Sequence, residues 1–430
     1  MKCVVRQCLG FGKVKTLVVL LLGAIFIYAV LRLYMDGCCE TSHYQYPWEA
    51  VKVTMFGHSR QATELRNQTE DKKEESVTEH ERVVKLSKLL QHRLTLVTDR
   101  EPEKVHEKCQ NDTAFRCNPT TPCSRPLETR SPLERVRGLV SSPWVQLSQE
   151  QLSLALSLTE HIPDNDIIIA SSCSDNHFNE LQAMFKNLRQ TVFPKLQNFT
   201  VIVFDLGLTE RQRVVTESVS NVVTFPFKKF PKHVQDVMCY SWKPIIMAAS
   251  MARARKLLVY QDSSIRWNHT FHQTFQRALL YGQQAVLSPG ASFPGNTLRE
   301  MFEYMEEEAC PFRPFMELQG GIHLIRRDPL VIEAVLHPWL KCALEKDCMC
   351  PKDPQSVLYC YSPRLHRCHR FDQSAFNLIM SKLYGVERYK MTIPRNDTTL
   401  KVDRKDRHPS YLYELKYGSN YIMALAMPMF

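Results

Sequence analysis

Lys256-Leu-Leu-Val-Tyr-Gln-Asp-Ser-Ser-Ile-Arg-Trp267 is the segment of this 430-residue chain that decides its fold. Residues 257–260 form a short apolar run, as a strand covered on both faces requires. Asp262 follows this strand directly. Ligands of open α/β sheets bind at the carboxyl ends of the strands, so a carboxylate there is placed to hold a metal-bound diphosphate or a sugar hydroxyl. The alternative is a strand that ends in a simple Asp-Ser turn.

Strand and helix patterns alternate on both sides of this segment. Residues 166–170, 198–204 and 221–225 have the apolar pattern of strands, and residues 177–191 and about 238–254 have the periodicity of helices. Three strands joined by helices before a fourth are most simply arranged as a parallel α/β sheet. Further along the chain we expect strands at 284–288 and 320–325 and helices at 297–308, 329–345 and 370–384.

The amino-terminal segment has the pattern of a membrane anchor. Residues 17–31 are apolar and uncharged. Four basic residues precede them: Lys2, Arg6, Lys13 and Lys15. We therefore expect a cytoplasmic tail at 1–15, a transmembrane signal-anchor at 16–35 and a type II orientation. A cleaved signal peptide is the alternative, but the apolar run is longer than a typical one and no small-x-small cleavage site follows.

Residues 36–160 are predicted to form a lumenal stem between the anchor and a folded body at 161–430. The stem is dense in charges of both signs and then rich in Pro, Thr and Ser, a composition that buries no core of its own. Residues 83–90 carry one short apolar stripe at helical spacing. Since apolar heptads are not sustained, we expect a solvated spacer there rather than a coiled-coil rod.

Cysteine usage and glycosylation sequons indicate an oxidising compartment. Of the 15 cysteines, 13 follow the anchor. Asn-x-Ser/Thr sequons begin at Asn67, Asn111, Asn198, Asn268 and Asn396. Five cysteines lie close together with histidines near them: Cys342, Cys348, Cys350, Cys360 and Cys368. Their spacing lacks the paired Cys-x-x-Cys of zinc sites, so we expect disulfides.

Charge and composition argue against several function classes. The formal net charge of +10 is spread along the chain, and no basic tract with interleaved aromatic residues occurs, so nucleic acid is not an expected partner. The chain has only 14 glycines and contains neither Gly-x-Gly-x-x-Gly nor a Walker loop, which argues against phosphate cradles built from backbone amides. The absence of Gly-x-Ser-x-Gly and His-Glu-x-x-His argues against the common serine and zinc hydrolases.

Six short motifs between residues 161 and 395 carry a resemblance to a family. They are Val203-Phe-Asp-Leu-Gly-Leu208, Phe225-Pro-Phe227, Tyr240-Ser-Trp-Lys-Pro244, Tyr260-Gln-Asp-Ser-Ser264, Gly320-Gly-Ile322 and His369-Arg-Phe-Asp-Gln-Ser374. With the anchor and stem, they resemble an uncharacterised group of invertebrate and nematode type II membrane proteins that is usually placed among the GT-A fold nucleotide-diphospho-sugar transferases. The resemblance implies a GT-A-like (Rossmann-like) mixed, mostly parallel sheet flanked by helices, and a glycosyltransferase reaction. It specifies neither the donor nor the acceptor.

The resemblance gives Asp262 the position of the acid that holds the donor, and a metal, after the fourth strand. Many GT-A enzymes carry a second acid two residues later, where Ser264 stands in this chain. Two accounts of donor binding stay open. Either Asp262 holds Mn²⁺ or Mg²⁺ with help from elsewhere, for which His369 is a candidate, or cations such as Lys243 and Arg266 neutralise the diphosphate without a metal.

Other candidate donor-binding residues lie near other strands. Ser172 and Asp175 follow the first strand, where GT-A folds receive the nucleotide, although Asp175 also suits a helix cap. Asp205 follows the second strand and either contacts nucleotide or braces the turn. Gly320 and Gly321 either admit the donor sugar close to the backbone or form a tight loop.

Asp372 and Gln373 lie in the first turn of the helix predicted at 370–384. A carboxylate at a helix start orients an acceptor hydroxyl or acts as its base, or it serves the helix dipole alone. Asp372 and Asp262 are thus the candidate catalytic residues, and Gln373 is a further candidate donor ligand.

The sequence predicts a single-pass type II membrane protein of the Golgi, with the plasma membrane as the less favoured location. Its lumenal body is expected to move a sugar from a nucleotide-sugar donor to a glycan, protein or lipid acceptor. The alternative is a non-catalytic lectin-like or receptor ectodomain on the same scaffold, since a fold does not determine a function.

Overall fold

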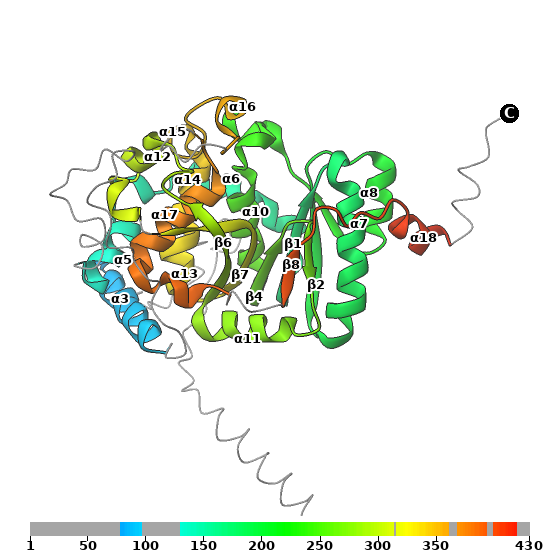
Figure 1. The fold of residues 1–430 in the computed structure, drawn as a ribbon, viewed down its shortest axis with the longest axis horizontal. Helices are drawn as coiled ribbons and strands as arrows, with labels where there is room; N and C mark the ends of the chain where they lie inside the picture. The colour runs from blue at the N-terminus through cyan, green and yellow to red at the C-terminus, as the bar shows by residue number, and fades with distance from the viewer. Residues whose placement is uncertain (1–77, 97–129, 314, 361–367, 394–398, 419–430) are drawn as a thin grey trace, which may run out of the picture. The chain divides into compact units, whose positions relative to one another are not determined.

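A six-stranded sheet forms the centre of the folded body (Figure 1). The computed structural model describes residues 78–96, 130–313, 315–360, 368–393 and 399–418. The strand order is β3-β2-β1-β4-β7-β6, and β5 pairs with β8 in a separate two-stranded sheet. The strands are β1 (Asn165–Cys173), β2 (Phe199–Asp205), β3 (Asn221–Thr224), β4 (Ala254–Gln261), β5 (Ile265–Trp267), β6 (Gln283–Ser292), β7 (Met316–Arg326) and β8 (Leu400–Val402).

Strands β1 to β4 are parallel, and β6 and β7 are antiparallel to their neighbours. β1 pairs in parallel with β2 and β4, and β2 with β3, whereas β7 pairs antiparallel with β4 and β6. The expected mixed, mostly parallel sheet is therefore confirmed. The chain passes from β1 through β2 to β3 and then places β4 on the other side of β1. The carboxyl ends of β1 and β4 thus flank the point where the winding reverses, which is where open α/β sheets bind ligands.

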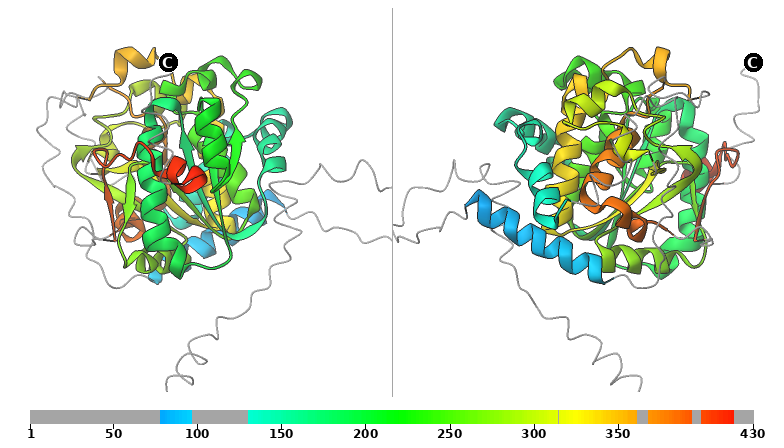
Figure 2. Two further views of the ribbon diagram at one scale, coloured as in Figure 1. Left: turned by 90° about the vertical axis from the view of Figure 1, so that its right-hand side faces the viewer. Right: turned by 60° about the vertical axis from the view of Figure 1, so that its left-hand side comes forward.

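Helices pack on both faces of the sheet (Figure 2). Because side chains alternate along a strand, Val259 of β4 joins an apolar cluster with α7 and α11, while Tyr260 faces Lys243 of α10 on the other side. The longer helices are α3 (Glu79–Thr95), α5 (Pro132–Val140), α6 (Gln149–Leu156), α7 (Phe178–Asn187), α8 (Glu210–Glu217), α10 (Trp242–Arg253), α11 (Phe271–Tyr281), α14 (His337–Leu344), α17 (Asp372–Tyr384) and α18 (Tyr411–Tyr417). The shorter helices are α9 (Lys232–Gln235), α12 (Arg299–Tyr304), α13 (Pro329–Val331), α15 (Lys346–Met349) and α16 (Pro354–Val357).

The described stretches of the predicted stem pack against the body. Helix α3, blue in Figure 2, contacts α5 and α13, and its residues Val83, Leu86 and Leu90 are at most 2% exposed. Arg93 of α3 forms a buried ion pair with Asp328, with 2.9 Å between Nη2 and Oδ2. The expectation of a solvated spacer is wrong for this helix, because its apolar stripe is covered by helices that are distant in sequence.

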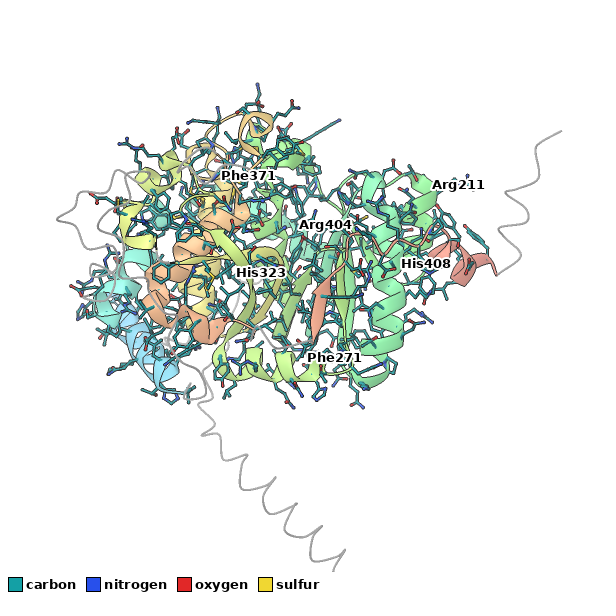
Figure 3. The ribbon with its side chains drawn as sticks, in the orientation of Figure 1. Arg211, Phe271, His323, Phe371, Arg404 and His408 are labelled. Carbon is teal, nitrogen blue, oxygen red and sulfur yellow. A yellow bond between two sulfur atoms is a disulfide. The ribbon has the colours of Figure 1, made fainter. Side chains whose placement is uncertain are left out.

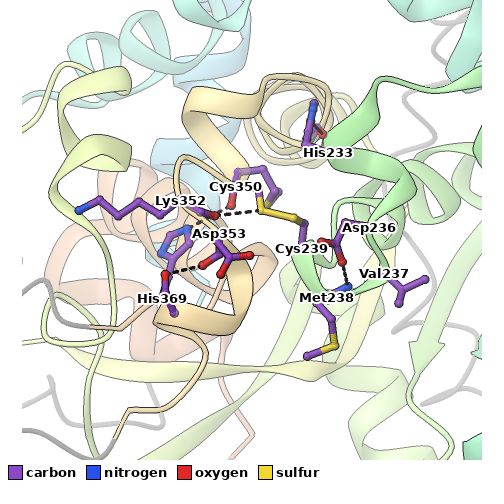
Figure 4. Close-up of a disulfide and its surroundings, with 12 residues drawn as sticks. His233, Asp236, Val237, Met238, Cys239, Cys350, Lys352, Asp353 and His369 are labelled. Carbon is purple, nitrogen blue, oxygen red and sulfur yellow. Dashed lines mark hydrogen bonds between the residues drawn. A yellow bond between two sulfur atoms is a disulfide. The ribbon is translucent and has the colours of Figure 1, made fainter.

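Disulfides join cysteines of the folded body, and one of them connects the loop before α10 to the segment around α15. The pairs are Cys239–Cys350 (Figure 4), Cys342–Cys348 and Cys360–Cys368. The expectation of disulfides for the five clustered cysteines is therefore confirmed. The first of these bonds joins residues 111 positions apart and fixes the chain where it enters α10.

Several expectations fall on segments that the structure does not describe. The tail at 1–15 and the signal-anchor at 16–35 lie outside the described residues. Among the residues that are described, no helix combines the length and the apolar character that crossing a bilayer requires. Asn198 and Asn268 are described and exposed. The other sequon asparagines lie outside the described residues: Asn67, Asn111 and Asn396.

The packing of α3 on the body is testable by truncating its buried stripe. Leu90 is fully buried, so Leu90→Ala is expected to lower the free energy of unfolding by about 2–5 kcal/mol. Leu96 at the end of α3 is 38% exposed, and Leu96→Ala should change it by less than about 0.5 kcal/mol. Urea denaturation of both variants measures the difference, and equal small effects would contradict the packing.

Candidate functional site

Lys243 is a buried cation held between two carboxylates. It is the second residue of α10, and its Nζ lies 3.4 Å from Oδ1 of Asp262 and 3.3 Å from Oδ2 of Asp372. Its Nζ also donates a 3.0 Å hydrogen bond to the carbonyl oxygen of Gly320. The Lys243 side chain is only 5% exposed, and such burial requires opposite charges and hydrogen bonds around the ammonium. We call Lys243, Asp262 and Asp372 the charge cluster.

Asp262 is the solvent-accessible member of the charge cluster. Its side chain is 30% exposed, against 5% for Asp372. The Tyr260 hydroxyl donates a 2.9 Å hydrogen bond to Oδ1 of Asp262 and lies 3.1 Å from Oγ of Ser172. This chain of contacts joins the carboxyl ends of β4 and β1. Asp262 is therefore fixed by the sheet and still reachable by a ligand at the winding reversal.

Gly320 and Gly321 in β7 make room for the two carboxylates. A Cβ atom at Gly320 would lie 2.9 Å from Oδ2 of Asp372, and one at Gly321 would lie 2.9 Å from Oδ2 of Asp262. Both distances are shorter than real Cβ contacts, so a side chain at either position would displace an acid. The Gly320 N–H also donates a 3.0 Å hydrogen bond to Oε1 of Gln373. These glycines were expected either to admit a donor sugar or to form a tight loop. They lie within β7, and the space directly beside them holds the acids of the charge cluster.

Asp372 begins α17, at the start of a helix as predicted. The residue before it, Phe371, has a φ of 46°, which is strained for a residue other than glycine. Burial raises the pKa of Asp372 to about 6, with Lys243 opposing the rise and Asp262 adding to it. The carboxyl group therefore titrates close to neutral pH, where a general base is most effective.

Three aromatic rings surround the Lys243 ammonium. The ring centroids of Tyr240, Trp242 and Tyr260 lie 5.5, 5.6 and 5.5 Å from Nζ. Burial lowers the pKa of Lys243, but the two carboxylates of the charge cluster outweigh this effect and hold the pKa well above its usual range. Lys243 is therefore a permanent cation of the site.

Tyr240 and Tyr260 belong to the site but were not identified from the sequence. Tyr240 has a left-handed backbone with a φ of 52°, and its ring centroid lies 6.0 Å from that of Phe371. Figure 3 labels Phe371 and, within the sheet, His323 of β7. The signal for Tyr260 was its place two residues before Asp262, since alternate residues of an extended chain share one face.

The charge cluster does not fit a divalent cation held by protein side chains. Within the described part of the chain, no group of three His, Cys, Asp or Glu side chains is placed to hold a metal ion. The position between Asp262 and Asp372, which attracts a cation from two sides, is taken by the Lys243 ammonium. The built-in cation that the second account requires is therefore present beside Asp262.

His369, the second candidate metal ligand, is buried and has both ring nitrogens engaged. Its Nδ1 accepts a hydrogen bond from the Leu298 N–H at 3.3 Å, and its Nε2 lies 3.1 Å from the Met349 carbonyl oxygen. Burial lowers the pKa of His369 to about 4, so the ring is neutral. A metal at His369 would have to displace one of these two contacts.

Two predicted donor-binding residues make structural contacts in the protein. Asp205 accepts hydrogen bonds from the N–H groups of Gly207 and Leu208 at 2.8 and 2.7 Å, so it braces the turn after β2. Asp175 accepts a 2.6 Å hydrogen bond from Nε2 of Gln212. It is not the expected helix cap, because α7 begins without a side-chain cap.

The structure thus brings most of the predicted site residues together. Ser264 is buried in the turn after Asp262, next to the site. The residues that the contacts above connect directly are Ser172, Lys243, Asp262, Gly320, Gly321, Asp372 and Gln373.

Replacing Asp372 is expected to change the pH dependence of stability. The pKa is raised from 3.8 to about 6, so the folded protein binds more protons than the unfolded protein between these values. The destabilising contribution of Asp372 is therefore absent below about pH 4 and complete above about pH 6. The free energy of unfolding of the wild type relative to Asp372→Asn should fall by about 3 kcal/mol between pH 4 and pH 7. Chemical denaturation at both pH values tests this, and a difference independent of pH would contradict the raised pKa.

The close approach at Gly321 predicts that even one methyl group is destabilising there. Gly321→Ala places a Cβ 2.9 Å from Oδ2 of Asp262 and should lower the free energy of unfolding by about 1–3 kcal/mol. Gly138 in α5 is the matched control, because a Cβ there meets nothing within 4 Å. Gly138→Ala should be neutral or stabilising by up to about 1 kcal/mol, as expected in a helix. Denaturant midpoints compare the two variants, and a neutral Gly321→Ala would show that the carboxylate has room to move.

Comparison with known proteins gives one family match and several distant fold similarities. Residues 144–248 match the family model described as "Protein of unknown function (DUF1647)". No curated protein matches the chain.

Three solved structures illustrate the fold similarities. The galactosyltransferase LgtC in complex with donor and acceptor sugar analogs has 11% identity and a TM-score of 0.32 over 61% of this chain and 98% of that chain. Core-mannan synthase A from Aspergillus fumigatus in an Mn/GDP form has 10% identity and a TM-score of 0.33 over 53% of this chain and 72% of that chain. The mannosyltransferase Ktr4p from S. cerevisiae has 9% identity and a TM-score of 0.32 over 69% of this chain and 83% of that chain. At this distance, the similarities carry no function over to this chain.

Proposed function

We propose that the chain is a glycosyltransferase that moves a sugar from a nucleotide-sugar donor to an acceptor. The observation that carries the proposal is the charge cluster at the winding reversal of the sheet, with Asp262 accessible and Asp372 buried behind it. This edge is where open α/β sheets bind nucleotides. The motif resemblance described for residues 161–395 points to the same class of reaction.

The two acids suit two different tasks in such a reaction. Asp262, reachable and fixed by Tyr260, positions the donor. Asp372, with a pKa of about 6, accepts the proton of the acceptor hydroxyl. In this step the acceptor oxygen bonds to the anomeric carbon, the bond from that carbon to the diphosphate breaks, and the nucleoside diphosphate leaves. Lys243 keeps Asp372 mostly ionised at neutral pH, since its charge lowers the pKa that burial raises.

The setting we propose is the lumenal side of the Golgi membrane, with a type II anchor and a glycan, protein or lipid acceptor. The disulfides Cys239–Cys350, Cys342–Cys348 and Cys360–Cys368 support an oxidising compartment. The exposure of the sequon residues Asn198 and Asn268 is compatible with glycosylation there.

The proposal is tested by turnover of nucleotide sugars by the full chain in detergent. A panel of UDP-, GDP- and CMP-sugars is incubated with the protein, and released nucleotide is measured with and without saccharide acceptors. Asp262→Asn should lower the rate with the active donor by about 100-fold or more. Asp164→Asn is the matched control, because Asp164 is 60% exposed and pairs with Arg253 near the start of β1.

The outcomes separate the enzyme from its alternative. Full activity of Asp262→Asn would contradict the role of Asp262. A wild type that neither binds nor turns over any nucleotide of the panel would support the lectin-like or receptor ectodomain instead.

A further inference from the structure

The cations that the sequence offered for the donor diphosphate are already engaged. Lys243 is shared by two carboxylates, so the charge cluster has one ammonium against two acids and is net negative when both are ionised. Arg266 is buried, and its guanidinium contacts Asp406 at 2.6 Å and the carbonyl oxygens of Ser263 and Ile265 at 2.6 and 2.9 Å. A diphosphate at this edge therefore needs a positive charge from another part of the chain.

Residues 403–410, which we call the strap, run from the end of β8 to α18 along the edge of the sheet (Figure 1). The Asp403 N–H donates a 2.8 Å hydrogen bond to the carbonyl oxygen of Ser264, two residues after Asp262. The His408 N–H donates a 2.9 Å hydrogen bond to the carbonyl oxygen of Asn179 in α7. The strap is thus fixed beside Asp262 at one end and over α7 at the other.

The middle of the strap is fixed as well. Nη2 of Arg266 donates a 2.9 Å hydrogen bond to the carbonyl oxygen of Asp406. Oδ1 of Asp403 accepts hydrogen bonds from the N–H groups of Lys405 and Asp406 at 3.2 and 3.0 Å. The backbone on both sides of Arg404 is therefore held in place, although Arg404 itself is exposed.

Arg404 (Figure 3) is a cation without a partner among the described residues: no hydrogen bond or ion pair there involves its guanidinium. It is nevertheless close to the charge cluster in electrostatic terms. Burial raises the pKa of Tyr240, and Lys243, Asp372, Asp262 and Arg404 are the charged groups that act on that hydroxyl. The strap thus holds Arg404 near enough to the charge cluster for its charge to act on the Tyr240 hydroxyl.

We propose that the Arg404 guanidinium, carried by the strap that is fixed next to Asp262, binds the diphosphate of the nucleotide-sugar donor. A guanidinium presents a planar fork of N–H donors that matches phosphate oxygens, and an exposed one loses little by leaving water for them. The inference rests on the proposed function and adds the residue that recognises the charged part of the donor. The fixed backbone of the strap limits the entropy that Arg404 loses on binding.

The test is binding of UDP and GDP to the full chain in detergent, by isothermal titration calorimetry with EDTA present. Arg404→Gln should weaken binding of the nucleotide that the wild type prefers by about 10- to 100-fold, the loss expected for a charge-assisted contact. Arg404→Lys, which keeps the charge without the fork, should lie in between. Thermal unfolding should be unchanged in both variants, because the side chain is exposed.

Lys405→Gln is the matched control, since Lys405 is the neighbouring exposed cation of the strap. It should weaken binding less than about twofold, as expected for a screened charge. If Arg404→Gln binds the nucleotide as tightly as the wild type, the role of Arg404 is overturned. The same holds if Lys405→Gln loses as much affinity as Arg404→Gln. Either result leaves the proposed function standing. A wild type that binds neither nucleotide, with EDTA or with Mn²⁺, would overturn both.

Discussion

The buried contact of Lys243 with Asp262 and Asp372 is the constraint on which the rest of the site depends. An ammonium buried without partners would lose several kcal/mol of hydration free energy, so the ends of α10, β4 and α17 must meet within ion-pair distance. Their meeting requires glycine at 320 and 321, since a Cβ there would occupy the space of the acids. The same contact keeps Asp372 from being fully protonated at neutral pH despite its burial.

Much of the sheet could be predicted from the sequence because its signals are local. Each predicted strand in 166–325 is present, since apolar runs of this length are buried by both helical layers. The place of Asp262 at a ligand-binding edge followed from its position directly after a buried strand. That Lys243, Asp262 and Asp372 form one cluster could not be predicted, because the three residues are far apart in sequence and meet only through tertiary packing.

The wrong expectations also have physical causes. Helix α3 looked solvated because its charges dominate its composition, yet a stripe ending at Leu90 is enough to dock it on α5 and α13. Arg266 was expected to be available to neutralise a diphosphate. Its guanidinium, which extends from β5, instead contacts backbone carbonyl oxygens and the Asp406 carboxylate. Tyr240 was not identified because a left-handed backbone conformation at tyrosine has no sequence signature. The turn that contains it is next to the Cys239–Cys350 disulfide, whose cysteines are 111 positions apart.

The serine at 264 and the arginine at 404, which has no partner in the described part of the chain, fit one charge balance. With an ammonium already between Asp262 and Asp372, a further acid at 264 would add negative charge to a cluster that is net negative. The backbone carbonyl oxygen at position 264, which any residue would supply, accepts the Asp403 N–H hydrogen bond that fixes the strap and with it the backbone of Arg404. One cation, Lys243, lies inside the acid pair, and a second, Arg404, stands on the strap that is attached two residues after Asp262. The single accessible carboxylate, that of Asp262, therefore shares its negative charge with the Lys243 ammonium beside it.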